Sequence, residues 1–113
     1  MTIKLSEALR NGPDIPKIQE RYITQDEYGT ITGACSLGRI WLATHTPSAE
    51  FLAMPYMFGQ AYLITSDLSA SFPQLKEHNG QVGNVHNFVT EYNDSDENPS
   101  FLEVAEMLES LGL

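Results

Sequence analysis

The last third of the chain carries two apolar stripes at helical spacing, separated by a polar loop. The first stripe consists of Val82, Val85, Phe88, Val89 and Tyr92, and the second of Phe101, Val104, Ala105, Leu108 and Leu111. Apolar side chains that recur every three or four residues share one side of a helix and need a partner surface. The loop between them, 93–100, is short, and a short connection favours antiparallel neighbours. The sequence therefore predicts that 82–92 and 101–111 pack as an antiparallel helix pair.

The ends of the final helix have clear signals. Ser100 stands three residues before Glu103, where the second stripe begins, which is the spacing of a capping box. Gly112 follows the stripe and suits the left-handed conformation that commonly ends a helix. We expect the helix to begin after Ser100 and to end before Gly112.

The first half of the chain predicts two helices and one hairpin. Leu5–Arg10 has the spacing of a short helix, which Asn11-Gly12-Pro13 ends, and a connector follows over 13–20. Two β-rich segments, Arg21–Thr24 and Thr30–Thr32, flank a polar turn that ends in Gly29, which predicts a hairpin. Ala34–Thr44 has a broad apolar face and is predicted to be the most buried helix. Its small residues, Ala34 and Gly38, would let a neighbouring element approach closely.

The middle of the chain is ambiguous. His45-Thr46-Pro47 breaks the preceding helix, and Ser48-Ala49-Glu50 could start another turn. Ala61–Thr65 has strand propensity, yet apolar residues recur at helical spacing at Met57, Ala61, Ile64, Leu68 and Phe72. We favour a helix that ends before Pro73 and keep the strand as the alternative. Asn79-Gly80 is predicted to be a turn.

These elements define a mainly α fold of the α+β class. A chain of 113 residues is long enough for one domain with its own core. We predict a single globular domain over residues 1–113, with about five helices and one short β-hairpin, that ends in the antiparallel helix pair.

Charge limits the classes of partner. Lys and Arg total 6 against 15 Asp and Glu, a formal net charge of −9, and no Lys or Arg follows Lys76. Such a charge disfavours nucleic acid and anionic membranes as partners, and favours basic protein surfaces or plain solubility.

No apolar run approaches the roughly 20 residues that span a bilayer, and one cysteine excludes an internal disulfide. We expect a cytoplasmic protein.

The acidic loop partly matches the frame of an EF-hand. When the frame starts at Asp94, Asp96 and Asn98 take its third and fifth positions. Pro99 then stands where the frame needs Gly, and Ala105 where it needs a bidentate Glu. We expect no calcium site.

Other chemistry-bearing residues lack partners in the sequence. Cys35 stands among small and apolar residues, so we expect a buried thiol and not a nucleophile. The spacing of His45, His78 and His86 does not match a zinc site, and His86 lies at the edge of a stripe, where a half-buried histidine is expected. No phosphate-binding loop is present. The sequence supplies no catalytic residue and implies no metal or cofactor.

Four short blocks resemble a set of small bacterial and phage-associated proteins of unknown function. The blocks are Leu5-Ser6-Glu7-Ala8-Leu9-Arg10 with Gly12, Ala34-Cys35-Ser36-Leu37-Gly38, Asn93-Asp94, and Val104-Ala105 with Leu108-Glu109. They touch both ends and the middle of the chain. The resemblance implies a helical fold and carries over no activity.

Two functional hypotheses follow. The first is a non-enzymatic acidic module that binds or regulates a protein with a basic surface, through Glu103, Glu106 and Glu109 on the outer side of the last helix. The second is a small-molecule binder or enzyme with an aromatic pocket, lined by Trp41, Tyr56, Met57 and Tyr62. A concave site with convergent polar groups would favour the second hypothesis, and a convex acidic face the first.

Overall fold

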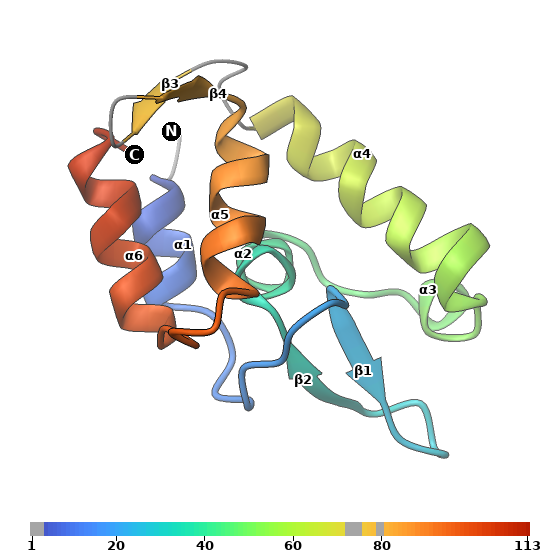
Figure 1. Cartoon of the computed structure of the whole chain (residues 1–113). Helices are drawn as coiled ribbons and strands as arrows, with labels where there is room; N and C mark the ends of the chain where they lie inside the picture. The colour runs from blue at the N-terminus through green and yellow to red at the C-terminus, as the bar shows by residue number, and fades with distance from the viewer. Residues whose placement is uncertain (1–3, 72–75, 79–80) are drawn as a thin grey trace.

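A computed structural model describes residues 4–71, 76–78 and 81–113 (Figure 1). Its elements in chain order are α1 (Leu5–Arg10), β1 (Ile23–Gln25), β2 (Ile31–Ala34), α2 (Ser36–Thr44), α3 (Ala49–Leu52), the π-helix η1 (Tyr56–Gln60), α4 (Ala61–Ser71), β3 (Lys76–His78), β4 (Gln81–Gly83), α5 (Val85–Asn93) and α6 (Phe101–Ser110). Helices dominate, so the predicted mainly α, α+β class is confirmed.

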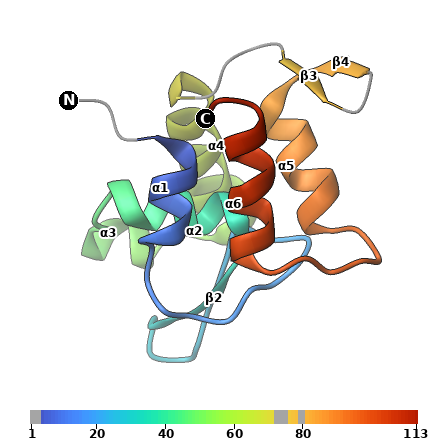
Figure 2. The same ribbon diagram turned by 90° about the vertical axis from the view of Figure 1, so that its left-hand side faces the viewer.

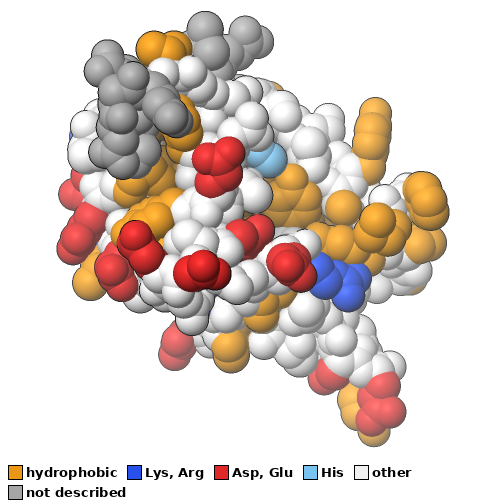
Figure 3. All heavy atoms as spheres, viewed as in Figure 1, with side chains coloured by type: hydrophobic (Ala, Val, Ile, Leu, Met, Phe, Trp, Pro, Cys, Tyr) orange, Lys and Arg blue, Asp and Glu red, His pale blue; other side chains and the backbone are white. Residues whose placement is uncertain are grey.

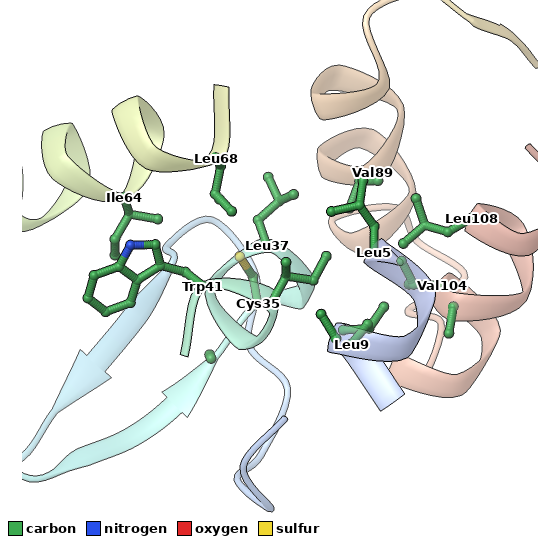
Figure 4. Packing of buried hydrophobic residues seen from close by; sticks show 14 of the residues in the cluster. Leu5, Leu9, Cys35, Leu37, Trp41, Ile64, Leu68, Val89, Val104 and Leu108 are labelled. Atoms are coloured by element: carbon green, nitrogen blue, oxygen red, sulfur yellow. The ribbon is translucent and has the colours of Figure 1, made fainter. Parts of the chain in front are cut away.

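Helix α2 occupies the centre of the fold. It contacts α1, α4 and α5, and its residues Leu37, Ile40 and Trp41 are buried (Figure 4). The prediction of a deeply buried helix is therefore confirmed, although the helix begins at Ser36. Ala34 belongs to β2, and Cys35 caps the helix by accepting a hydrogen bond from Gly38 N at 3.4 Å. A side chain at Gly38 would collide with the backbone of Tyr22, which explains the small residue there.

The predicted hairpin is present as β1 and β2. The strands are antiparallel, with Ile23 opposite Ala34, and a bulge interrupts the register between Thr24 and Gln25. Gly29 has a φ of 83° in the connecting turn, a conformation that favours glycine. Figure 1 shows the hairpin extending away from the helices; Ile23 and Ala34 belong to the core, and Ile31 packs against it.

The two C-terminal helices pack together as predicted, and α1 joins them. Figures 1 and 2 show α1, α5 and α6 side by side, with α5 and α6 running in opposite directions. The most extensive contact of α6 is with α1, and Ser6 ties the two ends of the chain by donating from N and Oγ to the carbonyl of Leu113 at 3.2 and 3.0 Å. The capping box of Ser100 with Glu103 is confirmed, and Gly112 has the expected positive φ of 78°.

The start of α5 differs from the prediction. Val82 was assigned to the helical stripe, but it lies in β4 and is 69% exposed. The helix begins at Val85 because Asn84 adopts an extended conformation and caps it, accepting from His86 N at 2.8 Å. The second strand pair, β3 with β4, was not predicted. Asn79-Gly80, the predicted turn, lies outside the described residues.

The helix favoured over 57–72 is present, but its first turn is different. The segment starts with η1, whose wider turn leaves Met57 72% exposed and buries Gln60 instead. Gln60 Nε2 donates to Gln25 Oε1 at 2.8 Å and to the carbonyl of Phe51 at 2.9 Å. Met57 therefore does not belong to the apolar stripe, whereas Ile64 and Leu68 are buried as predicted. Phe72 lies outside the described residues.

Candidate functional site

A cavity of about 260 Å³ opens where the entry to β1, the start of α2, η1 and α5 meet. We call it the Arg21 cavity. Its lining combines polar and aromatic side chains with an apolar floor: Glu20, Arg21, Tyr22, Cys35, Leu37, Tyr56, His86, Asn87, Thr90, Asn93 and Asp94. These residues come from four separate parts of the chain, so the cavity is a product of the tertiary fold.

Arg21 and Tyr56 form one wall of this cavity. The guanidinium carbon of Arg21 lies 4.0 Å from the centre of the Tyr56 ring, a cation–π geometry. The Tyr56 hydroxyl accepts a hydrogen bond from the backbone N of Tyr22 at 2.6 Å. Burial is the main cause that raises the pKa of Tyr56, so the phenol stays neutral at physiological pH. The wall therefore presents a fixed positive charge beside a neutral aromatic ring.

A neutral histidine also lines the cavity. His86 Nε2 lies 3.1 Å from the hydroxyl of Tyr22, which also lies 2.9 Å from Thr65 Oγ1. His86 is half-buried, as its place at the edge of the stripe predicted. Burial lowers the pKa of His86 below its ordinary value of 6.5, which favours the uncharged ring. The histidine thus contributes hydrogen bonding to the cavity without charge.

Cys35 lines the cavity and is buried, as predicted. Burial raises the pKa of its thiol to about 11, because a thiolate would lose its hydration there. The Sγ atom is used as the cap of α2. This environment opposes nucleophilic chemistry.

Asn93 is a buried hydrogen-bonding centre that sequence reasoning assigned only to a loop. Its Oδ1 accepts from Ser36 N and Oγ at 2.9 and 2.7 Å, and its Nδ2 donates to the carbonyl of Ile18 at 3.0 Å. The next residue, Asp94, accepts at Oδ1 from Asn93 Nδ2 and, at 3.2 Å, from Glu20 N. Two polar residues of the acidic loop therefore tie α5 to the entry of the hairpin.

Asp94, the first residue of the partial EF-hand frame, is engaged by the protein's own donors. Within residues 4–71, 76–78 and 81–113, no three His, Cys, Asp or Glu side chains are placed to hold a metal ion together. Asp94 directs its Oδ1 towards the protein's own donors. Absence of calcium binding stays a prediction, which calorimetric titration of the protein with CaCl₂ tests. A saturable micromolar isotherm that Asp94→Ala removes would contradict it.

The four aromatic-pocket candidates do not come together. Tyr56 lines the Arg21 cavity, but Trp41 is buried and stacks on Phe51 at 4.7 Å between ring centres, while its Nε1 donates to Asp67 at 2.8 Å. Met57 and Tyr62 are each 72% exposed. The predicted pocket is thus wrong in its membership, because Trp41 belongs to the core and Met57 and Tyr62 face outward.

These outward side chains form an exposed apolar surface instead. It consists of Met54, Met57, Phe58 and Tyr62, and we call it the Phe58 surface, since Phe58 is 93% exposed. Figure 3 shows apolar side chains gathered on the right-hand side of the molecule, over α3 and the start of α4. Sequence reasoning missed this surface. The available signal was the absence of any charged residue between Glu50 and Asp67 in so acidic a chain.

The acidic residues of α6 face solvent, as expected, but two have structural tasks. Glu103 accepts from Ser100 N at 3.1 Å in the capping box. Glu109 forms an ion pair with Arg10 across the contact between α6 and α1. Glu103 thus has the capping role that its spacing from Ser100 predicted, whereas the ion pair of Glu109 was not predicted. Glu106 is exposed.

Comparison with known proteins adds no identity: no family model, no curated protein and no solved structure matches the chain. None of the helices in the described parts of the chain is long and apolar enough to cross a membrane.

Proposed function

We propose that the protein is a non-enzymatic binding module that contacts a protein partner through the Phe58 surface. The observation that carries the proposal is the exposure of Phe58, Met57 and Tyr62 on adjacent turns of one segment. Contiguous exposed apolar side chains are costly for a soluble protein and commonly mark an interaction site. Aromatic residues and Met are also enriched in the centres of protein interfaces.

The segment that presents this surface supports the same proposal. A π-helix is rare and is frequently found at functional sites. Here, η1 departs from the α-helical pattern, and this departure turns Met57 away from the core. Gln60 and its two hydrogen bonds hold the irregular turn in place. The backbone is thus shaped to expose apolar side chains.

Charge indicates the kind of partner. The chain has a net charge of −9, while the segment between Glu50 and Asp67 is uncharged. A partner with an apolar recess surrounded by Lys and Arg would fit both features. The attraction between opposite charges would raise the rate of association, and apolar contact with the Phe58 surface would stabilise the complex. A second copy of the chain fits poorly, because two such charges repel. We place this interaction in the cytoplasm, and we regard Glu106 as part of the steering field.

The experiment uses site-specific photo-crosslinking in the native host, with the crosslinker at position 58 or, as a control, at position 28. Tyr28 is 85% exposed in the hairpin turn and serves as the matched exposed aromatic. A protein crosslinked only from position 58 is then purified and titrated with wild type, Phe58→Ser and Tyr28→Ser. We expect Phe58→Ser to weaken binding at least about tenfold.

Three outcomes would overturn the proposal. The first is equal crosslinking from both positions, and the second is equal affinity of Phe58→Ser and wild type. The third is a dimer in sedimentation analysis of the wild type that Phe58→Ser dissolves, since the surface would then serve self-association.

A further inference from the structure

The Arg21 cavity has the attributes of a ligand site. We propose that it binds a carboxylate carried on a small planar apolar group, with Arg21 as the counter-charge. The inference does not rest on the Phe58 surface.

The contacts of Arg21 indicate that the ligand carries a negative charge. Other basic side chains are used by the fold: Arg10 pairs with Glu109, Lys17 Nζ donates to the carbonyl of Asn93 at 3.0 Å, and Arg39 Nε donates to the carbonyl of Leu9 at 2.6 Å. In the part of the chain that the structure describes, no carboxylate lies within ion-pair distance of Arg21. Its guanidinium instead lies over Tyr56, with donors left for a planar acceptor. A carboxylate can accept two parallel hydrogen bonds from the planar guanidinium of an arginine.

The acidic residues at the cavity do not cancel this preference. Asp94 accepts two hydrogen bonds from protein donors, and its charge acts on the nearby Lys17. Glu20 and Arg21 are both exposed, so solvent screens both charges. Arg21 differs in that its guanidinium lies over the ring of Tyr56, which lines the cavity, and it is the charge that a ligand anion would meet there.

The backbone holds Arg21 in this position. Glu20 adopts a φ of 70°, a left-handed conformation that non-glycine residues rarely take, and its N donates to Asp94. Tyr22 N donates to the Tyr56 hydroxyl. Arg21 is thus fixed between two anchored neighbours. Strained backbone of this kind is retained where the surroundings enforce it, and it clusters at functional sites.

The remaining walls suit the body of such a ligand. Leu37 and the rings of Tyr22 and Tyr56 supply apolar and aromatic surface, and Asn87 adds neutral polar groups. Thr90 lines the cavity, and its buried hydroxyl oxygen has no hydrogen-bond partner within the described residues. A buried hydroxyl without a partner is costly, so a polar group of a ligand beside Thr90 would relieve that cost. A volume of about 260 Å³ is below the range of drug-sized sites, which limits the ligand to about one ring.

The test is a titration of the ¹⁵N-labelled protein followed by its amide resonances, with benzoate as the probe and benzamide as its neutral analogue. We expect saturable shifts at Arg21 and Thr90 with benzoate, with a dissociation constant on the order of 1 mM, as suits so small a ligand. Benzamide should cause no saturable shift. N-acetylphenylalanine, added separately, distinguishes a free acid from the carboxyl end of a peptide as the source of the group.

The variants make the test specific. Arg21→Gln should weaken benzoate binding at least about tenfold, because it removes the charge but keeps an exposed polar side chain. Lys4→Gln removes the same charge from an exposed residue outside the cavity and should have no effect. Phe58→Ser should also keep benzoate binding, which separates this site from the proposed protein interface. The proposal is overturned if neither acid shifts Arg21 and Thr90, if benzamide binds as well as benzoate, or if Arg21→Gln binds like wild type.

Discussion

Cys35 shows how one buried residue can serve local structure while it loses reactivity. Its sulfur accepts the hydrogen bond that begins α2, and the side chain is only 7% exposed. Since the pKa of the thiol is raised to about 11, little thiolate is present at pH 8. We expect a thiol reagent such as DTNB to label the native protein slowly, at a rate set by opening of the fold. Stoichiometric labelling within seconds, equal to that in 6 M guanidinium chloride, would contradict this expectation.

His86 gives the fold a defined response to pH. Its pKa is lowered in the folded protein, mainly by burial, so the unfolded chain takes up the proton first as the pH falls. The stability associated with a neutral His86 is complete well above pH 6.5 and is lost as the pH falls below that value. Urea unfolding of wild type should therefore show a lower midpoint at pH 5.5 than at pH 7.5. His86→Gln should reduce this difference, and an unchanged difference would show that other groups cause it.

At the scale of elements, helix caps were the features most accessible from sequence. The Ser100–Glu103 pair and Gly112 were both assigned correctly, because a cap depends on residues only a few positions apart. The end of the helical stripe before Val85 was missed, because it depends on more than the residues next to it. A valine suits a strand and a helical stripe equally, and the choice depends on the conformation of Asn84 and on the pairing of β4 with β3.

The contact of α6 with α1 and α5 is open to a direct test. Leu108 is fully buried in the core of this three-helix group (Figure 4). Leu108→Ala should lower the free energy of unfolding by about 2–5 kcal/mol, through lost burial and the cavity left behind. Leu102→Ala, at a position 52% exposed on the same helix, is the control and should change stability by less than about 1 kcal/mol. Equal thermal stability of Leu108→Ala and wild type would exclude this packing.

At the scale of the whole molecule, the class of fold followed from periodicity, but the candidate sites did not. The Arg21 cavity combines residues from four regions that no local pattern relates, and Arg21 itself stands in an unremarkable polar stretch. The Phe58 surface depends on one irregular turn, the π-helix η1. It places Met57 on the exposed side of the segment, where a regular helix would have placed it on the buried side. Helical spacing assumes a regular turn, so it predicted burial for a residue that the π-helix exposes.

The acidic surface should influence the rate of association with the proposed partner. Glu106→Lys changes an exposed charge of α6, so we expect little change in stability, within about 0.5 kcal/mol. Association should slow, and its dependence on salt should weaken, because steering is screened over about 8–10 Å near physiological ionic strength. Stopped-flow mixing with the crosslinked partner at several salt concentrations measures both. Identical rates for Glu106→Lys and wild type would assign this residue to solubility alone.

Helices α1 and α6 lie side by side, although they stand at opposite ends of the described chain (Figure 2). During synthesis, Leu5, Ala8 and Leu9 emerge from the ribosome long before Val104 and Leu108 exist to cover them. Domains commonly fold as units, and contacts between distant segments form late because the intervening chain must first be closed. The side of α1 that packs on α6 therefore stays uncovered until α6 has been made, even after α2 has covered its other side. We expect this side of α1 to be a site at which a chaperone binds the chain before α6 is available.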